Sequence, residues 1–162
     1  MANVHNVAAY ILDQCGAMST MKLQKLVYYS QAWHLVWAEE PLFDEEIQAW
    51  ANGPVVYELF DRHRGQFSVD EWQPGNGIRL DPAERGTIDA VIANYGDLTG
   101  RQLSALTHAE APWREARAHL GPTDRSSVPI SKDAIAAYYM AVDLDEDARE
   151  IDELTWDGES RD

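Results

Sequence analysis

The sequence predicts a mainly α protein: a single compact helical domain with a buried central helix, one or two short β-strands and a disordered acidic C-terminal tail. The stretch 19–38 is apolar around most of its helical circumference, which is typical of a helix surrounded by others. Helix-capping residues precede several further apolar segments, and ten acidic residues fall at 143–162. A chain of 162 residues suits one domain with a substantial core. We therefore place the domain at 1–142 and a mobile tail at 143–162.

The central helix is predicted to be capped by Ser19 or Thr20 and to end near residues 39–41. Its apolar positions recur at helical spacing and are expected to hold the fold: Leu23, Leu26, Val27, Trp33 and Trp37. A short polar edge is expected to face solvent and consists of Lys22, Lys25 and Tyr29.

The other elements follow from caps and turns. Asn3 is a predicted N-cap for a first helix that stops at Gly16, and the alternation at 46–51 predicts a brief strand. The turn at 52–54 places Pro54 at the start of a further helix. The stretch 66–80 fits a short hairpin or an irregular loop equally well. Three later helices are predicted behind the caps Asp81, Thr99 and Ser131, the last of them carrying Val142.

Charge and cysteine content narrow the function classes. The net charge is −15, of which the tail contributes −8, so neither part offers the basic surface that neutralises phosphates. Direct nucleic-acid binding is therefore not expected. The single cysteine, Cys15, excludes an intramolecular disulfide and suits a reducing compartment. With no signal peptide and no membrane segment in the pattern, the expected location is cytoplasmic.

A search for catalytic patterns finds no Gly-rich phosphate loop, no GxSxG and no HExxH motif. His108 and Glu110 match half of a zinc deaminase signature, but the pair of cysteines that completes it is missing. Cys15 is expected to be an inert buried residue rather than a nucleophile paired with His34, and His34 a buried core histidine. We therefore predict no enzyme activity, no catalytic residue, no metal site and no cofactor, and keep an enzyme with an unrecognised site as an alternative.

Three segments resemble, in this order, the Panacea or SocA-type antitoxin domain, which phage-associated proteins of the GepA type share. They are MKLQKLVYYSQAWHLVW at 21–37, EPLFDEEIQAWANGPVVYELFDRH at 40–63 and LTHAEAPWREA at 106–116. The resemblance runs from about residue 5 to 120 and leaves the tail outside.

The resemblance implies the antitoxin of a toxin–antitoxin pair. Its partner would be a cognate protein toxin, encoded by a neighbouring gene and neutralised by direct protein–protein binding without catalysis. One alternative is a proteolytic adaptor that delivers a toxin or another partner to a cytoplasmic protease complex, as the SocA type does. Another is a phage-encoded interaction protein.

Two sets of residues are assigned within these segments. The partner-binding hypothesis takes the residues that border one groove for a toxin segment: Lys22, Lys25, Tyr29, Trp50, Asn52, Gly53, Pro54, Tyr57, Glu58 and Asp61. Aromatic residues beside a rigid turn are the composition of an interface hot spot. The structural set is Leu23, Leu26, Trp33, His34, Thr107, His108, Pro112 and Trp113. The alternative that both motifs are internal, with Trp113 packed on the central helix, stays open.

The tail allows two interpretations. It is either a solvated mobile end, or a segment that folds onto a basic toxin and masks its RNA- or nucleotide-binding face.

Overall fold

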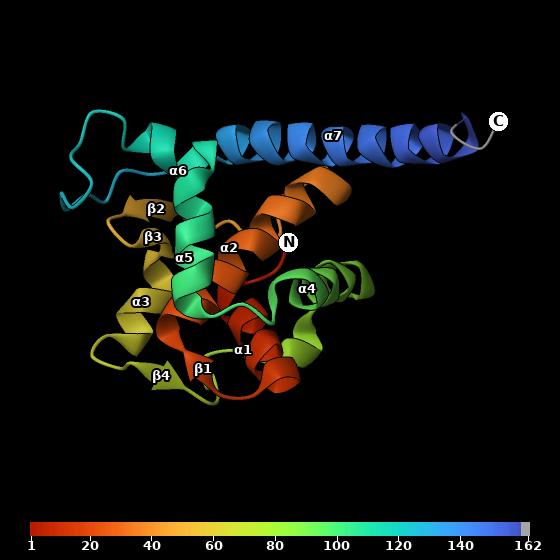
Figure 1. Cartoon of the computed structure of the whole chain (residues 1–162). Coiled ribbons are helices and arrows are strands. Elements are labelled where there is room, and N and C mark those ends of the chain that lie inside the picture. Colours follow the sequence, from red (N-terminus) through yellow and green to blue (C-terminus); the bar gives the residue numbers. More distant parts are fainter. Residues whose placement is uncertain (160–162) are drawn as a thin grey trace.

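The computed structural model of the chain describes the backbone of residues 1–159 and the surroundings of the side chains up to residue 147. Within this range it contains seven α-helices (Figure 1), so the mainly α prediction is confirmed. The helices are α1 (Val4–Cys15), α2 (Thr20–Trp37), α3 (Tyr57–His63), α4 (Pro82–Tyr95), α5 (Gly100–Ala109), α6 (Ala111–Ala116) and α7 (Lys132–Glu159). The strands are β1 (Met18–Ser19), β2 (Ile47–Trp50), β3 (Gly53–Val56) and β4 (Ser68–Val69), and one 3-10 helix spans Gly77–Arg79.

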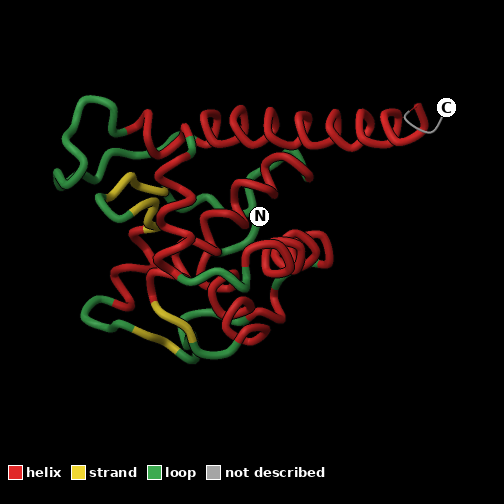
Figure 2. The backbone as a smooth tube through the Cα atoms, in the orientation of Figure 1, coloured by secondary structure: helices red, strands yellow, loops and turns green. Residues whose placement is uncertain are grey.

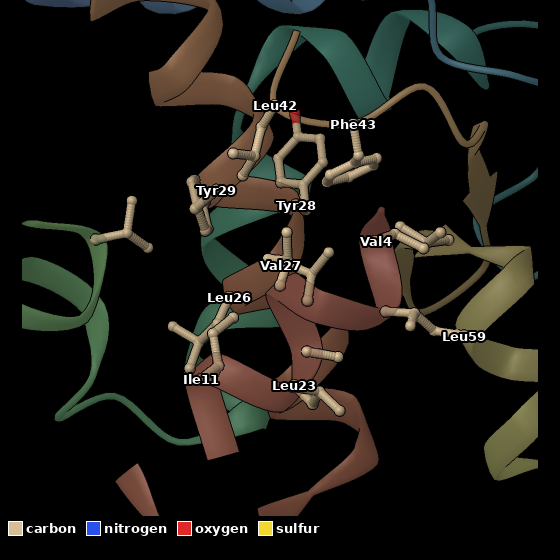
Figure 3. Close-up of a cluster of buried hydrophobic side chains, with 14 of the residues drawn as sticks. Val4, Ile11, Leu23, Leu26, Val27, Tyr28, Tyr29, Leu42, Phe43 and Leu59 are labelled. Atoms are coloured by element: carbon tan, nitrogen blue, oxygen red, sulfur yellow. The ribbon is translucent and has the colours of Figure 1, made fainter. Parts of the chain in front are cut away.

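Helix α2 is the centre of the fold, as predicted. It packs against α1, α4, α5 and α7, and every side chain from Leu23 to Leu35 is buried. Figure 3 shows Leu23, Leu26 and Val27 of this helix gathered with Ile11 and Leu59 in the core. Ser19 caps the helix by accepting a hydrogen bond from the Lys22 backbone N–H. The burial of apolar residues on all sides of α2 therefore stabilises the fold through the hydrophobic effect.

The predicted caps are present. Asp81 and Glu84 form a reciprocal capping box at the start of α4, and Thr99 and Gln102 form another at α5. Asn3 caps α1. Each box satisfies two backbone N–H groups that the first turn of a helix leaves without an internal partner.

The prediction that a helix begins at Pro54 is wrong. Residues Gly53–Val56 instead form β3, which pairs antiparallel with β2 across a two-residue turn at 51–52. The β-branched pair Val55 and Val56 favours a strand, and the Pro54 position tolerates the missing N–H because it lies on the edge of the pair. Helix α3 begins only at Tyr57.

The stretch 66–80 is mostly irregular. Its only strand among the described residues, β4, pairs with β1 at Met18–Val69 and Ser19–Ser68. A second long connection, residues 117–131, joins α6 to α7 and is visible as a loop in Figure 2. Part of it lies along β2, where the Ala49 N–H donates to Val128 O and the Ile130 N–H donates to Ile47 O.

Helix α7 passes the predicted domain boundary at 142 and continues to Glu159 (Figure 1), so most of the expected disordered tail has a helical backbone. The segment 143–159 contains no proline, and its four Glu and two Leu favour helix, whereas its five Asp favour it less. The division at 142 therefore falls inside one helix, and residues 160–162 lie outside the described residues. No helix of the described chain is both long and apolar enough to span a membrane.

Candidate functional site

The three resemblance segments meet at one place in the fold. We call it the motif junction, formed by α2, the β2–β3 hairpin and the joint between α5 and α6. The Lys25 ammonium donates to Pro54 O at 3.1 Å, and the Ser104 hydroxyl donates to Asn52 O at 2.5 Å. The Trp113 indole N–H donates to Trp50 O at 2.7 Å. Thus each of the other two segments bonds the hairpin backbone directly.

Gly53 lies at the closest approach in the motif junction. Its φ of +125° is a conformation that favours glycine. A Cβ at this position would lie 2.5 Å from Lys25 Cε and 3.2 Å from Thr107 Oγ1. The glycine therefore allows α2 and α5 to close on the hairpin from both sides.

A partly buried carboxylate ties α2 to the α5–α6 joint. Glu110 Oε1 accepts hydrogen bonds from the hydroxyls of Tyr29 at 2.5 Å and Tyr139 at 2.8 Å. The Tyr29 ring also stacks on Tyr95, with 4.2 Å between centroids. Burial raises the pKa of Glu110, which the two hydrogen bonds partly offset. We read this cluster as a structural link, since Tyr29 has no exposed surface.

The α6 end of the junction is held by an aromatic stack and an arginine. The rings of His108 and Trp113 are parallel with centroids 3.9 Å apart, and the Arg117 guanidinium lies 5.3 Å from the centre of the Trp113 ring. Arg117 donates to Ala49 O at 3.0 Å and to Asp124 O at 2.6 Å. It therefore connects the hairpin to the 117–131 connection.

Two residues that sequence reasoning did not assign are Gln24 and Gln31. The Val56 N–H donates to Gln24 Oε1 at 2.8 Å while Gln24 Nε2 donates to Val56 O at 3.1 Å. Gln31 likewise accepts from the Leu42 N–H and donates to Phe43 O, each at 2.7 Å. Their spacing of seven residues on an apolar helix was the available signal, since buried amides are nearly always hydrogen-bonded.

An open cleft of about 640 Å³ lies beside the motif junction. Its floor and walls come from α2, the hairpin, α3 and the 117–131 connection. The lining residues are Thr20, Met21, Gln24, Lys25, Trp50, Ala51, Asn52, Val55, Phe60, His63, Arg125, Ser126 and Ser127. Trp50 and Phe60 meet edge to face at 4.6 Å, and Phe60 lies 6.0 Å from the Tyr57 ring on the outer side of α3. These three rings, which we call the aromatic row, connect the cleft to the surface.

The expected exposed edge of α2 is wrong in two of its three members. Lys25 is 2% exposed and Tyr29 is fully buried, because the hairpin and α4–α6 cover the face that the sequence left open. Lys22 is partly buried and donates to Gly96 O at 2.6 Å. Lys25 nevertheless lines the inner wall of the cleft, so a partner contact remains a prediction for it.

The remaining predicted partner-binding residues divide by burial. Gly53 and Pro54 are buried and Trp50 is partly buried, whereas the exposed ones are Asn52, Tyr57, Glu58 and Asp61. The exposed charges have local partners: Glu58 lies 3.3 Å from His5 Nε2 and Asp61 lies 3.3 Å from Arg64. The residues assigned to the structural set are buried, apart from the partly buried His108: Leu23, Leu26, Trp33, His34, Thr107, Pro112 and Trp113.

His34 and Cys15, the two residues considered as a catalytic pair, differ in their exposure to solvent. His34 is buried, as expected, with Nδ1 at 2.8 Å from Thr87 Oγ1, and burial lowers its pKa. Cys15 is exposed rather than buried, because it ends α1 at the surface. Among the described residues, no group of three or more His, Cys, Asp and Glu side chains is placed to hold a metal ion.

The buried lysine makes stability depend on pH. Burial lowers the pKa of Lys25 to about 7, so between pH 7 and its ordinary value of 10.5 the unfolded chain binds more protons than the folded one. The free energy of unfolding is therefore expected to rise with pH, by up to about 1.4 kcal/mol per unit for one proton. Urea titrations at pH 7.5 and 8.5 measure this slope. Lys25→Met is expected to flatten it, and an unchanged slope in that variant would contradict the assignment.

The comparisons with known proteins bear on the same three segments. The family model described as antitoxin SocA-like, Panacea domain, matches residues 23–114, more than half of the chain. The chain belongs to this family. The match contains α2 from Leu23 onward, the hairpin and the α5–α6 joint, so it includes the elements that build the motif junction.

A curated relative supports the membership. The antitoxin SocA of Caulobacter vibrioides (strain NA1000 / CB15N) is 29% identical over 124 residues, which cover 66% of this chain and 66% of the relative, just under two thirds of its length. No solved structure matches the chain. The description of the family and the name of the relative are both those of antitoxins.

Proposed function

We propose that this protein is the antitoxin of a toxin–antitoxin pair and neutralises its toxin by direct protein–protein binding. The observation that carries the proposal is the Panacea domain, matched over residues 23–114 and supported by the SocA relative. The toxin is expected to be a protein encoded by a neighbouring gene. Catalysis has no part in this function.

The binding surface that we propose consists of the cleft, the aromatic row and the exposed face of α3. The cleft is open and mostly apolar, with Trp50 and Phe60 in its walls, and aromatic side chains beside a concave surface are typical of interface hot spots. Tyr57 is 44% exposed and continues this surface outward, with Asp61 one turn further along α3. Buried members of the motifs, such as Gly53 and Trp113, would support the surface from behind.

The test is co-expression with the product of the neighbouring gene. The wild-type chain is expected to restore growth and to co-purify with that product. The double variant Tyr57→Ala/Asp61→Ala is expected to weaken binding about tenfold or more, since central aromatic interface residues typically contribute 2 kcal/mol or more. Phe67→Ala is the matched control, because Phe67 is an aromatic residue that is 85% exposed and lies outside the proposed surface. Binding that the double variant leaves intact would mean that α3 is the wrong surface.

The same experiment separates sequestration from delivery to a protease. A toxin that is neutralised by binding alone keeps its cellular level during rescue. A toxin whose level falls only when the antitoxin and an active cytoplasmic protease are both present is delivered by an adaptor. Repeating the assay without residues 145–162 tests whether the acidic end of α7 masks a basic face of the toxin.

A further inference from the structure

We propose that the cleft receives a toxin segment that carries a carboxylate next to an apolar side chain, with the carboxylate facing Lys25 and Arg125. This inference rests on the proposed antitoxin function and adds the chemistry of the segment that is bound. Three features of the cleft carry it: its charge, its walls and the way its rim is held.

The charge of the cleft is opposite to that of the protein. Of the described residues that line it, none is acidic, while Lys25 and Arg125 are basic. The whole chain nevertheless carries 28 acidic residues against 13 Lys and Arg, so a cleft without any acid is a local exception. A segment with a carboxylate is attracted to this site and repelled by the acidic surface elsewhere. This difference favours one position of the segment in the cleft.

Arg125 is exposed at the rim of the cleft, and Lys25, which is 2% exposed, reaches the cleft from its inner wall. Neither Lys25 nor Arg125 belongs to an ion pair of the described residues. The Lys25 ammonium has three donors, and among the described residues Pro54 O is the one acceptor that it bonds. A carboxylate in the cleft would accept from it and would favour its charged form, which burial disfavours.

The walls favour an apolar side chain beside that carboxylate. Met21, Val55, Trp50 and Phe60 line the cleft, and the edge-to-face pair of aromatic rings offers a flat surface for an aliphatic or aromatic group. His63 adds no Nε2 donor to the cleft, because this atom accepts a hydrogen bond from Gln24 Nε2 at 3.0 Å. Burial also lowers the pKa of the His63 ring. A free anion without an apolar part would leave most of this wall uncovered.

The rim that carries Arg125 is fixed to the body of the domain. Arg117 donates to Asp124 O, directly before Arg125, and Val128 O accepts from the Ala49 N–H of β2. The three rim residues 125–127 are thus held between two anchors. An ordered rim lowers the entropy cost of binding, since the cleft is formed before its ligand arrives.

Selection of displayed random linear peptides for binding to the immobilised full-length chain tests the inference. The peptides retained are expected to combine Asp or Glu with a neighbouring aliphatic or aromatic residue. Arg125→Glu, a change at an exposed position, is expected to weaken these peptides about tenfold through loss of a charge-assisted contact. Arg101→Glu is the matched control because Arg101 is exposed on α5 and does not line the cleft.

Each outcome decides one of the two proposals. Loss of the acidic preference in Arg125→Glu but not in Arg101→Glu, together with competition between such a peptide and the toxin, supports the inference. The inference is overturned if no peptide is retained or if the retained peptides are basic. It is also overturned if Arg125→Glu and Arg101→Glu retain the acidic peptides equally. The inference is overturned as well if the chain forms a dimer and Arg125→Glu dissociates it, because the occupant of the cleft is then a second copy. If the wild-type chain fails to bind the neighbouring gene product at all, the antitoxin proposal fails instead, whatever the peptides show.

Discussion

Replacing Gly53 with alanine is expected to destabilise the protein by about 2–4 kcal/mol, from backbone strain at positive φ together with overpacking. The new Cβ would lie 2.5 Å from Lys25 Cε, in a space that also holds Thr107. Lys25 cannot swing away freely because it is buried and bound to Pro54 O. Chemical unfolding followed by far-ultraviolet circular dichroism measures the loss.

Two controls isolate the cause. Gly65 also has a positive φ, +82°, but nothing lies within 4 Å of a Cβ placed there. Gly65→Ala should therefore show the strain alone, about 1 kcal/mol. In a Lys25→Ala background, Gly53→Ala should cost less than in the wild-type chain, because the nearest contact atom is gone and only the Thr107 contact at 3.2 Å remains. Equal costs for Gly53→Ala with and without Lys25 would show that the close contact does not limit this position.

Trp113→Ala is expected to cost about 3–5 kcal/mol, the usual range for removing a buried tryptophan. The change deletes the indole donor to Trp50 O and the ring that stacks on His108. Trp37→Ala is the matched control. Trp37 was predicted to hold the fold, but it is 45% exposed at the end of α2 and contacts Trp33 by stacking at 5.2 Å. Its loss should cost about 1 kcal/mol or less, and similar losses at the two positions would contradict the role of Trp113.

Local signals in the sequence predicted the local structure well. The capping boxes at Asp81 and Thr99 are present because a cap needs only residues three apart. The central position of α2 followed from its apolar circumference. The resemblance segments were also the right ones, since they build the motif junction and fall largely within the family match.

Features that depend on distant partners were not predictable in the same way. Lys25 and Tyr29 are polar at their tips, so the pattern placed them in solvent, yet Pro54 O and Glu110 lie in position to accept their donors. The helix assigned to Pro54 failed for a similar reason, because β3 depends on pairing with β2. The cleft could not be foreseen either, since it needs Arg125 from a connection for which the sequence predicts no element.

The hydrogen bonding of the β2–β3 hairpin limits the ways in which the hairpin can bind a partner. The outer side of β2 is paired with Val128 and Ile130. On the outer side of β3, the Lys25 ammonium donates to Pro54 O. Gln24 donates to Val56 O and accepts from the Val56 N–H. The described hairpin thus presents no open main-chain ladder onto which a foreign strand could add. The recognition that we propose for the cleft would then not use strand addition to the hairpin, so partners of unrelated backbone shape could share the cleft if they present the same two neighbouring groups.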